Sequence, residues 1–182
     1  MPSARTEFLK LNIGSRDMRI PGFKNVDCDP HDGVEFVSPV EDLGVFDDEC
    51  ASEIYASHIL EHFSHRMTVK VLQEWGRVLV KGGILYLSVP DFDYAAKMYL
   101  KHGLNQWIQH FLMGDQGYET AFHYTIFNEH NLRGALMDAG FSEASKIEKL
   151  PYTSTCGNRA DCSSLRSTLD GTIVSLNMVA IK

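Results

Sequence analysis

Short apolar runs alternate with amphipathic stretches along most of the chain. Runs rich in branched and aromatic side chains, bounded by glycine, proline or polar turn residues, are typical of β-strands. The run ILYLSV at 84–89 is the clearest, because it is almost wholly apolar, as a strand buried on both faces would be. Strands are predicted at residues 8–13, 23–27, 34–37, 53–57, 84–89, 145–150 and 172–181.

Four longer stretches have the periodicity of amphipathic helices. In the first, Val69, Leu72, Val78 and Leu79 recur near helical spacing. We expect Lys81-Gly82-Gly83 to end that helix, since glycine adopts the left-handed conformation common just after a helix. Helices are predicted at 65–80, at 91–101 with Asp91 as the capping residue, at 104–113, and at 128–139.

Strands that alternate with helices indicate an α/β fold with a mostly parallel, Rossmann-like sheet. The last two predicted strands are joined by a loop, so they should form an antiparallel C-terminal hairpin at one edge. The first crossover is unusual: only eight residues separate Gly14 from Phe23, so its helix should be shortened or absent. One sheet face would then lack a helix, and we expect a second subunit in a homodimer, or the segment 104–124, to cover it.

Composition excludes several functional classes. The 182 residues are 44% apolar and 23% charged, which fits a single domain over 1–182. A net charge of −7 makes sequence-independent nucleic-acid binding unlikely, because such binding needs a basic face. No apolar run approaches the roughly 20 residues of a membrane helix. Without a CxxC pair or a recognisable secretory leader, reduced thiols and a cytoplasmic location are expected, with a Cys156–Cys162 disulfide or weak metal pair as the alternative.

Three predicted strand ends carry side chains suited to a nucleotide-like ligand, which open α/β sheets bind beyond the carboxyl ends of their strands. After the first strand, Gly14 would let the backbone approach a ligand closely. Asp27 ends the second strand and could accept both ribose hydroxyls. Further along, the Asp42 side chain could receive an adenine amino group while the Leu43 backbone reads the ring edge.

Several runs in this order resemble a compact family of class I S-adenosylmethionine-dependent methyltransferases, of the methyltransferase type 11 kind. The resemblance spans about residues 8–140, and its most specific part is the Glu74 to Gly83 stretch followed by a hydrophobic strand. The runs are LNIGS at 11–15, PGFKNVD at 21–27, HILEHF at 58–63, EWGRVLVKGG at 74–83 and LSVPD at 87–91.

The resemblance implies S-adenosylmethionine as cofactor, a cofactor-binding half over about 8–90, and acceptor-side helices with a lid over about 91–145. Arg16 stands where the family has a second glycine, so it either pairs with the cofactor's carboxylate or fills the pocket. The implied cofactor-binding residues are Asn12, Gly14, Ser15 and Arg16 at the methionine part, Asp27 and Cys28 at the ribose, Asp42 and Leu43 at the adenine, and Ser57 and His58 beside the sulfonium.

The segment from His58 to His62 also fits H-x-x-E-H, the inverted zinc-protease motif. That motif requires a helix and a third ligand from elsewhere, whereas this segment begins at a predicted strand end and no downstream carboxylate stands out. We therefore expect no metal. The histidines and Glu61 either shape the helix start by hydrogen bonding or serve at the methyl-transfer site, where His62 and His123 are the candidate general bases.

The sequence thus predicts a methyltransferase that acts on a small-molecule or sugar acceptor. The alternative is a catalytically silent cofactor-binding or protein-interaction module, favoured by Arg16 and the missing helix. A nicotinamide-dependent oxidoreductase is disfavoured, because the chain lacks G-x-G-x-x-G at the opening of a helix.

Overall fold

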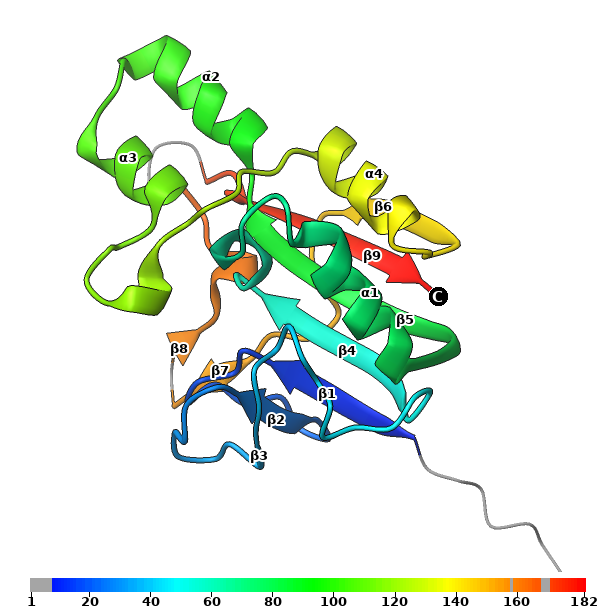
Figure 1. Ribbon diagram of the computed structural model, residues 1–182. Helices are drawn as coiled ribbons and strands as arrows, with labels where there is room; N and C mark the ends of the chain where they lie inside the picture. The colour runs from blue at the N-terminus through cyan, green and yellow to red at the C-terminus, as the bar shows by residue number, and fades with distance from the viewer. Residues whose placement is uncertain (1–7, 158, 168–170) are drawn as a thin grey trace, which may run out of the picture.

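The protein is built around a seven-stranded sheet (Figure 1). The structure, a computed structural model, describes residues 8–157, 159–167 and 171–182. The strand order is β3-β2-β1-β4-β5-β9-β6. The strands are β1 (Leu9–Ile13), β2 (Lys24–Asp27), β3 (Phe36–Val37), β4 (Ala51–Ser57), β5 (Leu79–Pro90), β6 (Glu143–Ile147) and β9 (Ser175–Ile181). A small second sheet pairs β7 (Thr155–Cys156) with β8 (Arg159–Ala160).

The direction of the strands agrees with the prediction. Strands β1 to β5 pair in parallel, whereas β9 runs antiparallel to both β5 and β6. The central strands are apolar because both of their faces are covered, and Ile54, Leu85 and Leu87 are fully buried. The fold is therefore α/β and Rossmann-like, with an antiparallel C-terminal hairpin.

The predicted helices are present, with ends shifted by a few residues. Side chains of Asp91, Asn105 and Asn128 accept hydrogen bonds from backbone N–H groups in the first turns of their helices. The helices are α1 (Thr68–Val78), α2 (Phe92–His102), α3 (Gln106–Met113) and α4 (Glu129–Asp138), with short 3₁₀ turns η1 (Leu60–His62), η2 (Glu119–Ala121) and η3 (Cys162–Ser164).

The expected glycine stop of the first helix is wrong. Helix α1 ends at Val78 and strand β5 begins at the next residue, so Lys81-Gly82-Gly83 lies within β5. The pairing of β5 with β4 shifts register here, from Ala51 opposite Leu79 to Glu53 opposite Ile84. Gly82 has a φ of 74°, so the glycine serves this irregularity of the strand rather than the end of a helix.

The first crossover has no helix, as predicted, and the sheet face opposite α1 and α4 is covered in an unexpected way. There Ile20 and Phe23 pack with Tyr55 and Leu150. Tyr152 adds edge-to-face ring contacts with Phe23 and Tyr86. The segment after β6 therefore covers part of this face, which we had expected residues 104–124 or a second subunit to cover, and the homodimer stays a prediction.

Helix α1 holds the long connection between β3 and β4. Glu74 accepts the backbone N–H of Leu43 (2.9 Å) and two bonds from Arg77 (2.7 and 2.9 Å). Arg77 in turn donates to the carbonyl oxygens of Leu43 and Phe46, and Trp75 donates its indole N–H to the carbonyl of Val40 (2.8 Å). These contacts explain the Glu-Trp-x-Arg pattern that the sequence resemblance singled out.

All four cysteines carry free thiols. Within the described parts of the chain, none of the helices has the length and apolar character needed to cross a bilayer.

Replacing Glu74 with Gln should lower the free energy of unfolding by about 1–2 kcal/mol at pH 7, because it removes the charge that Arg77 and the Leu43 amide stabilise. Hydrogen bonds from Arg77 hold the pKa of Glu74 below its ordinary value of 4.5. The stabilisation is therefore complete above pH 4.5 and is lost as the pH falls through the lower folded-state pKa. Denaturant unfolding of both proteins between pH 3 and pH 8 measures the difference.

The matched control is Glu129→Gln, which breaks the exposed i,i+4 pair with Arg133. It should cost no more than about 0.5 kcal/mol. Equal losses for the two variants would contradict a special role of Glu74.

Candidate functional site

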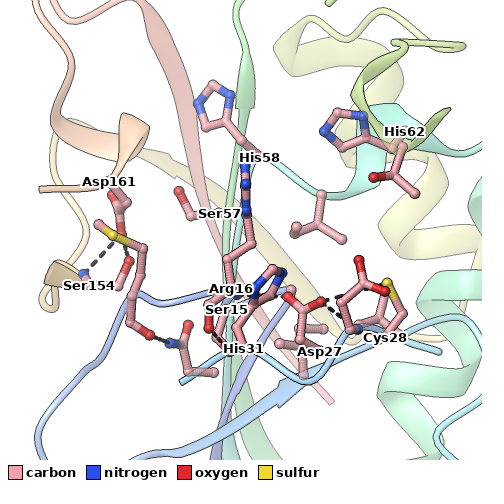
Figure 2. Close-up of a pocket in the computed structure, with 18 of the residues that line it drawn as sticks. Ser15, Arg16, Asp27, Cys28, His31, Ser57, His58, His62, Ser154 and Asp161 are labelled. Carbon is pink, nitrogen blue, oxygen red and sulfur yellow. Dashed lines mark hydrogen bonds between the residues drawn. The ribbon is translucent and has the colours of Figure 1, made fainter. Parts of the chain in front are cut away.

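A pocket of about 1000 Å³ lies at the carboxyl ends of the parallel strands (Figure 2). The structure brings most of the predicted site residues to its wall, whereas Asp42, Leu43 and His123 are not among the lining residues. The predicted residues that line it are Asn12, Gly14, Ser15, Arg16, Asp27, Cys28, Ser57, His58 and His62.

The turn after β1 requires a glycine. Gly14 has a φ of 62°, a conformation that residues with a Cβ rarely adopt. A Cβ at this position would also lie 2.1 Å from Cδ1 of Ile59. Glycine at this position therefore allows Ile59 to pack directly against the turn.

Buried side-chain amides of asparagine support this turn. Asn12 is 2% exposed and donates to the side chain of Asn25 (2.9 Å) and to the carbonyl of Met18 (3.1 Å). Its amide hydrogens are therefore engaged within the protein, so Asn12 supports the pocket floor.

Asp27, at the end of β2, is oriented by backbone donors. Its Oδ2 accepts the N–H of Arg16 (2.7 Å) and its Oδ1 accepts the N–H of Asp29 (3.0 Å). A carboxylate has about four lone-pair positions, so Asp27 can still accept hydroxyl groups from the pocket. Partial burial and the charges of Asp27 and Asp29 raise the pKa of the neighbouring Cys28 thiol, which keeps it protonated at neutral pH.

Arg16 lies at the mouth of the pocket and does not fill it. The residue is exposed, and its guanidinium donates to the hydroxyl of Tyr118 (2.9 Å) and lies over that ring. None of the ion pairs found among the described residues includes Arg16. Its charge is thus available to an anionic group in the pocket.

The connection after β3 meets the pocket two to three residues earlier than the sequence indicated. Pro39, Val40 and Glu41 line the pocket. Asp42 is exposed, and Leu43 is fully buried with its backbone N–H bound to Glu74. The Leu43 amide is therefore occupied within the protein.

One wall of the pocket comes from the segment after β6, which sequence reasoning missed. Ser154, Arg159 and Asp161 line the pocket, and Figure 2 shows Ser154 and Asp161 opposite Asp27. Asp161 accepts hydrogen bonds from the Ser154 hydroxyl and from Tyr55 (2.7 Å), whose pKa burial raises. The sequence offered only a polar, cysteine-containing loop here, with no periodicity to show that it folds back over the strand ends.

Three of the histidines gather around Glu61, beside the end of β4. His58 contacts Oε1 of Glu61 through Nδ1 (3.1 Å) and the Ser175 hydroxyl through Nε2 (2.9 Å). Glu61 is fully buried. Burial alone would raise the pKa of Glu61, but the facing His58 and His62 rings outweigh it and hold that pKa below its usual value.

His123 approaches this group from the segment after η2. The rings of His62 and His123 meet edge to face with centroids 4.9 Å apart. Burial lowers the pKa of His123. Two groups in the described chain bring potential metal ligands within 4.8 Å of one another: Glu61, His62 and His123, and Asp27, Asp29 and His31.

Comparison with known proteins identifies the fold. No protein-family model matches the sequence, and no curated protein matches it by sequence. Solved structures do match. A S-adenosylmethionine-dependent methyltransferase from Archaeoglobus fulgidus gives a TM-score of 0.58 at 12% identity, covering 96% of this chain and 86% of that one.

The names of two further matching structures mention a substrate or ligand of those proteins. A methyltransferase of Thermotoga maritima, described as a possible histamine N-methyltransferase, gives 0.58 at 16% identity over 97% of this chain and 83% of that one. The 1,6-didemethyltoxoflavin-N1-methyltransferase of Burkholderia thailandensis was solved with bound 1,6-didemethyltoxoflavin and S-adenosylhomocysteine. It gives a TM-score of 0.58 at 14% sequence identity, and the match covers 96% of this chain and 70% of that one. The chain has the fold of the class I S-adenosylmethionine-dependent methyltransferases.

Proposed function

We propose that the protein is a S-adenosylmethionine-dependent methyltransferase that acts on a small-molecule or sugar acceptor. The observation that carries the proposal is the pocket at the carboxyl ends of β1, β2 and β4, which joins the Gly14 turn to the Asp27 carboxylate on a methyltransferase fold. The cofactor half would comprise about residues 8–90 and the acceptor side about residues 91–145. Free thiols support a reducing, cytoplasmic setting.

The pocket residues fit the chemical groups of the cofactor. Gly14 and Ser15 line the pocket and suit the methionine part of the cofactor, and the unpaired charge of Arg16 suits its carboxylate. Asp27 would accept the ribose hydroxyls, and Val40 would contact the adenine. We move the adenine role from Asp42 and Leu43 to the Pro39–Glu41 stretch, because that stretch lines the pocket.

A buried hydroxyl lies where the sulfonium is expected. The Ser57 hydroxyl is shielded from solvent, its residue lines the pocket, and its interaction with the described residues is limited to the neighbouring Tyr55 hydroxyl, a contact too loose to count as a full hydrogen bond. A buried hydroxyl without a full hydrogen bond is costly, so a ligand atom there would stabilise the site. His58 follows Ser57 with a φ of 56°, a strained conformation of the kind found at binding sites.

On the acceptor side, His62, Thr120 and Tyr124 line the pocket. The bound cofactor supplies an electrophilic methyl group, and the protein's part is to hold the acceptor in line with it and exclude water. His62 is placed to take a proton from an acceptor hydroxyl. His123 lies behind it, with a lowered pKa that keeps its ring neutral at pH 7.

The second candidate is a catalytically silent module on the same fold. It is favoured by the arginine in place of a glycine and by the missing first helix. Cofactor binding separates the enzyme from a silent protein-interaction module, and methyl transfer separates it from a silent cofactor-binding one.

Calorimetric titration with S-adenosylhomocysteine should show one site per chain. Asp27→Asn should weaken binding by about tenfold to a hundredfold, since it removes the charged acceptor of the ribose hydroxyls while keeping the bond from the Arg16 amide. The control Asp138→Asn, at the exposed end of α4, should bind like the wild type.

Absence of binding by the wild-type protein at millimolar ligand would reject the enzyme and favour the silent module. Wild-type affinity in Asp27→Asn would instead move the ribose role to Asp29.

Arg16 should recognise only the amino-acid end of the cofactor. Arg16→Gln is expected to weaken S-adenosylhomocysteine binding about tenfold, because it removes a charged partner of the carboxylate. Binding of 5′-methylthioadenosine, which lacks that carboxylate, should not change. Arg133→Gln on α4 is the matched control. Equal losses for both ligands would show that Arg16 supports the pocket without pairing with the carboxylate.

A further inference from the structure

Two segments about sixty residues apart in the sequence meet beside the pocket. Glu61 and His62 belong to η1, just after β4, and His123 follows η2. One ligand atom from each of the three residues lies within 4.8 Å of the others. Donor atoms bound to one tetrahedral ion lie about 3.4 Å apart, since the bonds measure about 2.1 Å. Small side-chain rotations would therefore bring all three onto one ion.

Backbone hydrogen bonds hold the two segments together independently of these side chains. The carbonyl of Glu61 accepts the N–H groups of Tyr124 (2.8 Å) and Thr125 (3.2 Å). The Thr125 hydroxyl donates to the carbonyl of Phe63 (2.6 Å). The approach of His123 to Glu61 and His62 is thus part of the folded framework.

The hydrogen bonding of His62 prepares its ring for coordination. Nδ1 of His62 lies 2.9 Å from the carbonyl of Phe122. A carbonyl can only accept, so Nδ1 carries the hydrogen and Nε2 of the neutral ring has a free lone pair. A histidine that donates one ring N–H to a carbonyl is the usual arrangement around protein metal ions, because the bond fixes the ring's orientation.

Glu61 has a coordination position to spare. Its side chain is 1% exposed, and Oε1 contacts Nδ1 of His58 (3.1 Å). In the described chain, Oε2 of Glu61 has no hydrogen-bond partner. A buried carboxylate oxygen without a partner is unfavourable, and a cation beside it would remove that cost.

We propose that Glu61, His62 and His123 bind a divalent transition-metal ion of the zinc type at the acceptor side of the pocket. Two imidazoles and one carboxylate form a set that binds catalytic zinc and leaves a coordination position open. His62 lines the pocket, so the open position faces the acceptor. This replaces our expectation that the H-x-x-E-H segment holds no metal, because the structure supplies the third ligand, His123.

The role of the ion rests on the proposed function, although the site itself does not. An acceptor hydroxyl in the open position would become more acidic and lose its proton to water. Its oxygen then forms the bond to the methyl carbon, while the sulfur–carbon bond breaks and leaves its electron pair on sulfur. In this arrangement His62 is a metal ligand. The ion, and not His62 as a general base, then promotes loss of the proton from the acceptor hydroxyl.

The second potential cluster, Asp27, Asp29 and His31, is a poorer site. Both oxygens of Asp27 already accept backbone N–H groups, from Arg16 and Asp29. This cluster provides a control within the same pocket.

The test is a titration of the chelator-treated full chain with Co²⁺, whose visible absorption reports nitrogen and oxygen ligands. One Co²⁺ per chain should bind, and Zn²⁺ should displace it. His123→Ala and Glu61→Gln should each weaken Co²⁺ binding at least tenfold, whereas His31→Ala and His130→Ala, an exposed histidine on α4, should not. Circular dichroism and thermal unfolding confirm that each variant is folded, and His123→Ala keeps the test available if Glu61→Gln does not fold.

No Co²⁺ binding by the wild type at millimolar concentration would overturn the proposal. So would binding that survives in a folded His123→Ala but is lost in His31→Ala. S-adenosylhomocysteine titration of the same samples separates the two hypotheses. Metal binding without cofactor binding supports the metal site and rejects the methyltransferase, and the opposite result rejects the metal site alone.

Discussion

Parallel pairing of β1 with β2 and β4 places the pocket residues that follow these three strands. Ile13 at the end of β1 lies opposite Val26 on one side and Ala56 on the other, so the residues that follow these strands emerge side by side. The Gly14 turn, Asp27 and the Ser57-His58 corner are consequences of that register. A shift by one residue would turn Asp27, which is 5% exposed, toward the opposite face and remove the carboxylate from the pocket.

In a parallel sheet, crossover helices normally fix the connections between strands. Here side-chain hydrogen bonds hold two of these connections in place. Asn12 and Asn25 link the first two strands beneath the pocket. Glu74 and Arg77 bind the β3–β4 connection to α1. Asn12 and Asn25 are buried, whereas Glu74 and Arg77 are partly buried, and each pair is specific because its polar groups are satisfied by particular partners. These bonds tie the two connections to their neighbouring elements.

Features of this molecule that depend on interactions between neighbours in the chain could be predicted from the sequence, whereas those that depend on distant contacts could not. Helix periodicity, the Asp91 cap and the apolar β5 strand depend on neighbours in the chain, so the elements were predictable, as were the strand-end positions of Gly14 and Asp27. The sequence did not indicate that Asp42 and Leu43 lie outside the pocket lining, because the bond from Leu43 to Glu74 spans 31 residues and leaves no local pattern. The covering segment after β6 depends on tertiary packing alone, and no single-sequence pattern indicates it. The sequence named His62 and His123 as candidates for one site, but their ring contact and the approach of both to Glu61 also depend on tertiary packing.

Residues 118–125 contact the rest of the pocket at two points, one buried and one exposed. At one point the carbonyl of Glu61 binds the backbone of Tyr124 and Thr125, in a region where Glu61 is wholly buried. At the other, Arg16 contacts Tyr118 at the exposed mouth. The buried attachment is rigid, whereas an exposed guanidinium–hydroxyl bond exchanges readily with water. An anion that engages Arg16 would compete with Tyr118 for the same donors, so an anion bound in the pocket would loosen the contact between Arg16 and the segment around Tyr118.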